Sequence, residues 1–207
     1  AAMLSPAPMS FKENLPGPAC PALPGGGLIT LEGPDALAFA QSQFMGDVAA
    51  LAEGQWQWNG WLTPKGRVIA LFALARVAPA RLLLWLPDAA PAALAPALQR
   101  FVFRRKVAVR AEDRWVAAVG VGEALPRPVA PDRVAGDEAS GWVLDLGAPA
   151  CPRSLALLPA GDPRLAPADA AATAAWRAAD IALGLPRLGP AQAEAWRPCV
   201  NCRPSPS

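Results

Sequence analysis

The chain has 207 residues, of which 19 are basic and 17 acidic, and it contains neither histidine nor tyrosine. Without histidine it cannot build a Ser-His-Asp or Cys-His nucleophile pair, or a histidine-ligated zinc or iron site. A net charge of +2 is too small to favour bulk attraction to nucleic acid or membranes. An apolar content of 53% with 17% charged residues is typical of a globular protein.

The first half of the chain predicts an arm, a helix and a group of strands. Residues 1–26 are rich in proline and glycine and are expected to form an extended arm. A short strand is predicted at 28–32, and Gly33-Pro34-Asp35 predicts a helix start, with a proline and an acid in the first turn. Further on, Trp and Gln alternate at 55–58, as in a strand. We expect an antiparallel meander made of this strand and two more, at 67–75 and 81–86, with a turn at 63–66.

The second half predicts two more helices and several short strands. Pro87-Asp88 is expected to cap a helix with Leu94, Leu98 and Phe101 on one face, kinked or limited at Pro96. Residues 125–140 are expected to form a proline-rich connection, and an alanine-rich helix is predicted at 167–183. The predicted strands lie at 106–110, 115–121, 142–144 and 155–158. The fold class is therefore expected to be α+β, with mainly antiparallel sheets and about three helices.

The sequence shows no membrane or secretion signal. The strongest candidate span, residues 68–86, is interrupted by Arg76, Pro79 and Arg81, so two strands joined by a turn explain it better. No basic region followed by an apolar segment suggests a signal peptide. The 4 cysteines are too scattered for a secreted disulfide scaffold. We therefore expect a cytoplasmic protein without a membrane partner.

Several segments, in this order and spacing, resemble one protein family. The first reads LEGPD at 31–35 and is followed by QSQFMGDV at 41–48. The others are TPKGR at 63–67, LQRFVFRRKV at 98–107, and WRAADIALGLP at 176–186, which has the pattern WxxxxIxxGxP. Over about residues 27–198, the sequence resembles the YgfZ-like folate-binding proteins, relatives of the T-protein (aminomethyltransferase) of the glycine cleavage system.

The resemblance implies both a fold and a function. The fold would be the first two domains of the aminomethyltransferase-like folate-binding fold. The function would be binding of tetrahydrofolate or a derivative, support of iron–sulfur cluster protein assembly or repair, and a link to tRNA modification. The implied partners are a small-molecule folate and iron–sulfur proteins, without direct binding to nucleic acid.

Two features depart from the family pattern. The T-protein branch carries two aspartates after the lysine-glycine turn, where this sequence has Ala70 and Leu71. Aminomethyl transfer is therefore disfavoured, and we assign no catalytic residue. The family's KGCYxGQE segment and C-terminal barrel domain are also absent, and residues 199–207 read CVNCRPSPS. We expect a frameshift or a truncation, and the role of the signature cysteine does not carry over.

The resemblance also suggests a domain layout. A discontinuous folate-binding domain is expected to combine residues 27–50 and 111–198 around an inserted α+β domain at 51–110. The arm at 1–26 and an irregular tail at 199–207 would lie outside both. Because the family's third domain is missing, we expect exposed apolar surface, and with it either a homodimer or aggregation.

Folate binding requires a flat slot with apolar walls, an acceptor for the pterin N–H groups, and cations for the glutamate tail. The segment 44–67 offers these groups. Asp47 is the candidate acceptor, and Trp58 and Trp61 are candidate walls. The full set of candidate cofactor-binding residues is Met45, Asp47, Trp58, Trp61, Lys65, Arg67 and Arg100. Structural roles explain several of them equally well: core packing for the tryptophans, a hairpin turn for Lys65, and a turn cap for Asp47.

Two other motifs have weaker functional interpretations. Cys199 and Cys202 have CxxC spacing, but they lie in a proline-rich tail with no helix to follow, so we expect neither a redox site nor a metal site. The run at 104–106 is basic and is interleaved with Phe101 and Phe103. It suits a solvated face, a contact with an anion or folate tail, or an RNA-binding platform.

Two hypotheses compete with a YgfZ-type folate-binding protein. One is a one-carbon transfer enzyme like the T-protein, which the residue at position 70 argues against. The other is a non-catalytic interaction module that has lost its ligand site.

Overall fold

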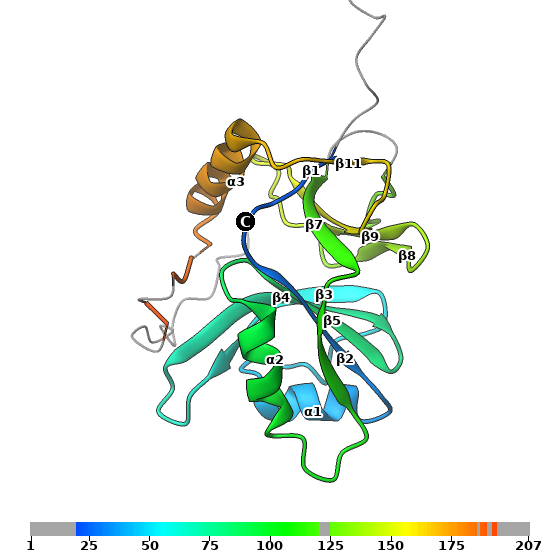
Figure 1. The fold of residues 1–207 in the computed structure, drawn as a ribbon, viewed down its shortest axis with the longest axis vertical. Coiled ribbons are helices and arrows are strands. Elements are labelled where there is room, and N and C mark those ends of the chain that lie inside the picture. The colour runs from blue at the N-terminus through cyan, green and yellow to red at the C-terminus, as the bar shows by residue number, and fades with distance from the viewer. Residues whose placement is uncertain (1–19, 121–124, 186, 190–191, 194–207) are drawn as a thin grey trace, which may run out of the picture.

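The computed structural model describes residues 20–120, 125–185, 187–189 and 192–193. Two sheets, both antiparallel, pack against each other (Figure 1). Two helices cover the outer face of the first sheet, and a third lies beside the second sheet. The hydrophobic residues form one core between the first sheet and its two helices, one between the sheets, and a smaller one outside the second sheet.

The first sheet has five strands in the order β3-β4-β5-β2-β6. Their bounds are β2 Gly27–Glu32, β3 Gln55–Leu62, β4 Val68–Ala78, β5 Arg81–Leu86 and β6 Ala108–Glu112. Both faces are buried, because side chains of successive residues point to opposite sides. In β4, Phe72 and Leu74 face the helices, whereas Ala73 and Ala75 face the second sheet.

Two short helices close the outer face of this sheet: α1, Ala36–Gln43, and α2, Pro91–Gln99. Phe39 of α1 and Leu98 of α2 are fully buried against the sheet. α1 ends where Phe44 becomes extended and forms a β-bridge with Trp61. The exit of α1 is therefore attached directly to the edge strand β3.

The second sheet has four strands in the order β7-β10-β9-β8. Their bounds are β7 Trp115–Gly120, β8 Val134–Asp137, β9 Gly141–Asp145 and β10 Ser154–Pro159. Trp115 and Trp142 pack with ring centroids 4.4 Å apart in the core between the sheets.

Two short segments and the last helix complete the fold. The strands β1, Cys20–Pro21, and β11, Leu165–Ala166, pair in parallel and lie outside the second sheet. Helix α3, Ala170–Ala182, buries Trp176 and Asp180. Within the described residues, no helix is long and apolar enough to cross a membrane.

The expected fold class is confirmed: the structure has three helices and mostly antiparallel sheets. Several details differ from the sequence prediction. Helix α2 begins at Pro91 rather than at Pro87-Asp88, because Asp88 binds Arg187 instead of capping the helix. The segment 125–140 contains β8, which was not predicted. Phe101 lies beyond the end of α2 and is 53% exposed, so it is not on a buried helix face.

The predicted domain layout cuts across the first sheet. β2, from the predicted discontinuous domain, is hydrogen-bonded to β5 and to β6. β5 belongs to the predicted insertion, which ends within β6. These pairings define sheets rather than independently folding units, so the domain division stays a prediction. Most of the predicted arm and the whole tail lie outside the described residues.

The start of α3 gives a first testable prediction. Asp169 is its N-cap, and its carboxylate accepts hydrogen bonds from the backbone N–H groups of Ala171 and Ala172. Replacing Asp169 with alanine should lower the free energy of unfolding by about 1 kcal/mol in urea titration, because both N–H groups lose their acceptor. Asp169→Asn should recover most of that loss, and equal values for the two variants would contradict the capping role.

Candidate ligand-binding site

The candidate site is built where the exit of α1 crosses the edge strand β3. The backbone N–H of Met45 donates to the carbonyl of Gly60, at 3.0 Å. The next N–H, of Gly46, donates to the Asn59 side-chain oxygen, also at 3.0 Å. These two bonds hold the segment 44–46 alongside β3 and fix where the Met45 side chain can lie.

Met45 lies over Gly60, and this contact explains the glycine. A Cβ added at Gly60 would come within 2.8 Å of the Met45 sulfur and 3.1 Å of a Leu71 methyl carbon. Met45 remains 50% exposed, whereas Leu71 is half-buried. Glycine in a strand commonly marks such a close approach of another group.

Trp58 lies on the same face of β3 as this contact, because it is two residues from Gly60. Its ring packs against Trp56 on one side and Trp85 on the other, with centroid distances of 6.1 and 6.3 Å. Trp58 is only half-buried. We call the group of Met45, Trp58, Gly60 and Leu71 the Met45 face.

Trp61 lies on the opposite face of the sheet. It belongs to the core under α1 and α2, where it is almost fully buried, and its ring contacts Phe101 with centroids 5.7 Å apart. Arg100, the residue before Phe101, is exposed at the end of α2. The two tryptophans proposed as walls of one slot therefore do not face each other.

The remaining predicted site residues lie at turns, and all are exposed. The carboxylate of Asp47 accepts the N–H of Ala50 at 3.3 Å, which is the turn-capping role considered above. Lys65 lies in the β3–β4 turn. The backbone N–H of Thr63 donates to the carbonyl of Arg67 there, and the N–H of Arg67 donates to the hydroxyl of Thr63. Gly66 has a φ of 72° there, in the left-handed region that favours glycine.

The phenylalanines beside the basic segment 104–106 are too exposed to form a buried face. Phe103 is 73% exposed, and the Arg104 guanidinium lies 5.0 Å from the centre of its ring. Val107, by contrast, is buried in the core. Whether this loop contacts an anion stays a prediction.

Asn59 is a site residue that the sequence interpretation missed. Its side-chain oxygen accepts from the N–H groups of Gly46 and Gly60, and the residue is almost fully buried. A Cβ at Gly46 would lie 2.7 Å from the Asn59 amide nitrogen, so the two residues fit only as a pair. The available signal was an Asn-Gly step inside a tryptophan-rich strand, where a polar residue needs a specific partner.

The described residues offer no constellation for metal chemistry. Among them, no group of three or more cysteines, aspartates or glutamates could hold a metal ion. Cys20 is buried and Cys151 half-buried. Cys199 and Cys202 lie outside the described residues. The site therefore consists of apolar and aromatic side chains with cations at nearby turns.

Comparison with known proteins bears on the fold. No protein-family model and no curated protein matches the sequence. Among solved structures, the chain is similar to glycine cleavage system aminomethyltransferase T from Bartonella henselae, with a TM-score of 0.59 and 22% sequence identity. The match covers 72% of this chain but only 46% of that one, so this chain spans less than half the length of that enzyme. At this identity the similarity shows the fold alone, and it confirms the predicted partial aminomethyltransferase-like fold.

Proposed function

We propose that this chain is a folate-binding protein of the YgfZ type that holds a tetrahydrofolate derivative. The observation that carries the proposal is the fold shared with an aminomethyltransferase, together with the ordered family motifs. Support of iron–sulfur protein assembly or repair, the link to tRNA modification, and a homodimer belong to the same proposal and rest on the resemblance alone.

The Met45 face is where we place the pterin ring. Trp58 offers an aromatic wall, and Met45 offers a flexible thioether that adapts to a flat ring. Gly60 makes room for the Met45 thioether to lie against the strand. Lys65 and Arg67, on the turn that follows β3, are the cations proposed for the glutamate tail. Asp47, at the exit of α1, is the proposed acceptor for the pterin N–H groups.

The residue at position 70 is the reason why we propose folate binding without aminomethyl transfer. The residue that matches the first aspartate of the T-protein branch is Ala70, which is buried on β4 and paired with Trp61. No carboxylate is present there to act on a folate nitrogen, and Leu71 occupies the next position. The proposal therefore assigns binding and leaves transfer aside.

The binding test is a titration with 5-formyltetrahydrofolate, followed by isothermal titration calorimetry. The unsubstituted chain should bind saturably, and Met45→Gln should weaken binding about tenfold, because a polar side chain then faces the pterin ring. Phe101→Ala is the matched control, since Phe101 is equally exposed but contacts Trp61 on the other face. It should leave the affinity unchanged.

The two variants also distinguish a protein that does not bind folate from one that binds it at another site. No heat and no change in tryptophan fluorescence at millimolar folate would overturn the binding proposal. If Phe101→Ala weakened binding and Met45→Gln did not, the site would instead lie on the helix side of the sheet, with Trp61 and Arg100.

A further inference from the structure

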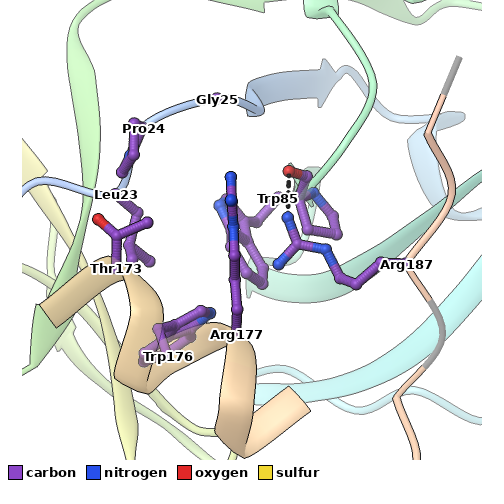
Figure 2. A pocket seen from close by; sticks show the side chains of 9 residues that line it. Leu23, Pro24, Gly25, Trp85, Thr173, Trp176, Arg177 and Arg187 are labelled. Atoms are coloured by element: carbon purple, nitrogen blue, oxygen red, sulfur yellow. Dashed lines mark hydrogen bonds between the residues drawn. The ribbon is translucent and has the colours of Figure 1, made fainter. Parts of the chain in front are cut away.

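A small pocket lies between α3, β5 and the chain that leads into β2 (Figure 2). Its space is about 10 Å³, room for roughly one water-sized group. Nine residues line it: Leu23, Pro24, Gly25, Trp85, Pro87, Thr173, Trp176, Arg177 and Arg187. None of them is acidic.

Two buried indoles in this pocket carry N–H groups without a partner. Trp85 is 4% exposed and Trp176 is 5% exposed. Among the described residues, neither indole nitrogen has a hydrogen-bond acceptor. A buried N–H without an acceptor destabilises the protein, so a site with two of them favours an occupant that accepts hydrogen bonds.

The charged groups around the pocket leave it positive. Arg187 lines it but is paired with Asp88 and Asp180. Asp180 also binds Arg153, whose guanidinium lies 4.5 Å from the centre of the Trp176 ring. Three arginines, namely Arg153, Arg177 and Arg187, are therefore balanced by only the two carboxylates of Asp88 and Asp180. Arg177 itself forms no ion pair with any described residue, and it stands beside the two indoles in Figure 2. The pocket therefore combines two indoles whose N–H groups have no acceptor with an arginine that has no ion pair among the described residues.

A wider, shallow apolar hollow along α3 adjoins this pocket. Pro24, Thr173 and Arg177 line both. The hollow has a volume of about 730 Å³, and its other lining residues are Ala168, Asp169, Ala170, Ala174, Ala178 and Ile181. Ile181 is 79% exposed, which is unusual for so large an apolar side chain.

We propose that this composite site binds a small amphipathic carboxylate. One carboxylate oxygen would enter the narrow pocket and accept hydrogen bonds from the indoles of Trp85 and Trp176, with Arg177 supplying the opposite charge. The apolar body would lie along α3 over Ala174, Ala178 and Ile181. Hydrogen-bond donors in a narrow pocket at one end and an apolar surface at the other match the usual composition of small-molecule sites. The site shares no residue with the Met45 face, but it adjoins that face, because the ring of Trp85 packs against Trp58.

The experiment is a titration of ¹⁵N-labelled protein with sodium octanoate below its micellar range, following the tryptophan indole N–H signals by NMR. Trp85→Phe and Trp176→Phe assign two of the signals. Both should shift downfield on saturation, because each N–H gains a charged acceptor. Arg177→Gln, at an exposed position, should weaken octanoate binding about tenfold to a hundredfold. Arg110→Gln, which changes an exposed arginine on β6, should not.

Two further ligands separate the parts of the site. Sodium formate should shift the same two signals at higher concentration, since it carries the carboxylate without the apolar body. 1-Octanol should bind more weakly than octanoate. The proposal is overturned if octanoate shifts neither signal, if Arg177→Gln binds octanoate as tightly as the unsubstituted chain, or if 1-octanol competes equally well. A folate-binding failure would leave these outcomes unaffected.

Discussion

Replacing Asp180 with alanine is expected to lower the free energy of unfolding by about 3 to 5 kcal/mol, the cost of breaking a buried ion pair by removing one partner. Asp180 lies on α3 with its side chain 5% exposed. One carboxylate oxygen is 2.7 Å from an Arg153 nitrogen, and the other is 2.6 Å from an Arg187 nitrogen. Removing the carboxylate leaves the guanidinium of Arg153, which is only 6% exposed, without an ion pair to any described residue.

The ion pairs of Asp180 join segments that are distant in the sequence. Arg153 immediately precedes β10, and Arg187 follows α3 and also binds Asp88, which precedes α2. The loss in Asp180→Ala should therefore appear as a change in global stability rather than local fraying. Equilibrium urea unfolding followed by tryptophan fluorescence measures it.

Two further variants control this measurement. Asp113→Ala removes an exposed acid in the loop between β6 and β7, and it should change stability by less than about 0.5 kcal/mol. Asp180→Asn keeps the size and the acceptor oxygen, so it should lose less than alanine does. A loss below about 1 kcal/mol for Asp180→Ala would show that the ion pairs do not hold these elements together.

The effect should persist at alkaline pH. Burial alone would lower the pKa of the Arg187 guanidinium, but the hydrogen bonds and charges of Asp88 and Asp180 together raise it above its ordinary value. A raised pKa means that the charged form contributes stability at every pH below the ordinary arginine value, and this is lost only above it. The difference between the unsubstituted chain and Asp180→Ala should therefore be the same at pH 7 and pH 9.

Replacing Gly26 with alanine should be the second large effect, a loss of about 3 kcal/mol or more. Gly26 has a φ of 73°, and a Cβ there would collide with the Leu86 carbonyl oxygen and lie 3.0 Å from the carbonyl oxygen of Pro87. The obstacle is backbone at the end of β5, which cannot move without disturbing the pairing of β2 with β5.

Gly54 provides a matched control for this variant. It has the same φ of 73°, but no atom lies within 4 Å of an added Cβ. Gly54→Ala should therefore show the conformational cost alone, about 1 to 2 kcal/mol. The difference between the two variants in thermal or urea unfolding measures the collision at Gly26. Equal losses would mean that the entry into β2 adapts freely.

The local sequence pattern predicts a large part of this fold, because apolar residues repeat every second residue in a strand but about every 3.6 residues in a helix. The alternation in β3 and the apolar runs of β4 and β5 correctly place the meander, and the alanine-rich segment that contains Trp176 correctly predicts α3. The same alternation already separates Trp58 from Trp61, because residues three apart in a strand point to opposite faces. Their use as two walls of one slot disregarded that parity.

Long-range contacts are what the pattern could not predict. Asp88 looks like a helix cap beside a proline, yet its carboxylate binds Arg187, 99 residues later. Asp180 looks like an isolated surface acid on an alanine-rich helix, yet it is buried between two arginines. Nothing local distinguishes these carboxylates from solvated ones, because their surroundings come from other elements of the chain.

The absence of histidine excluded most catalytic sites at the outset, and the strand and helix periods determined the fold class. Those conclusions depend only on composition and on neighbours within a few residues. The tertiary structure decided that Met45 lies over Gly60 beside Trp58, and that Trp85 and Trp176 meet at one pocket with Arg177. Such positions depend on how sheets and helices pack. Packing brings together residues that are far apart in the sequence, and the local pattern around one of them does not indicate the other.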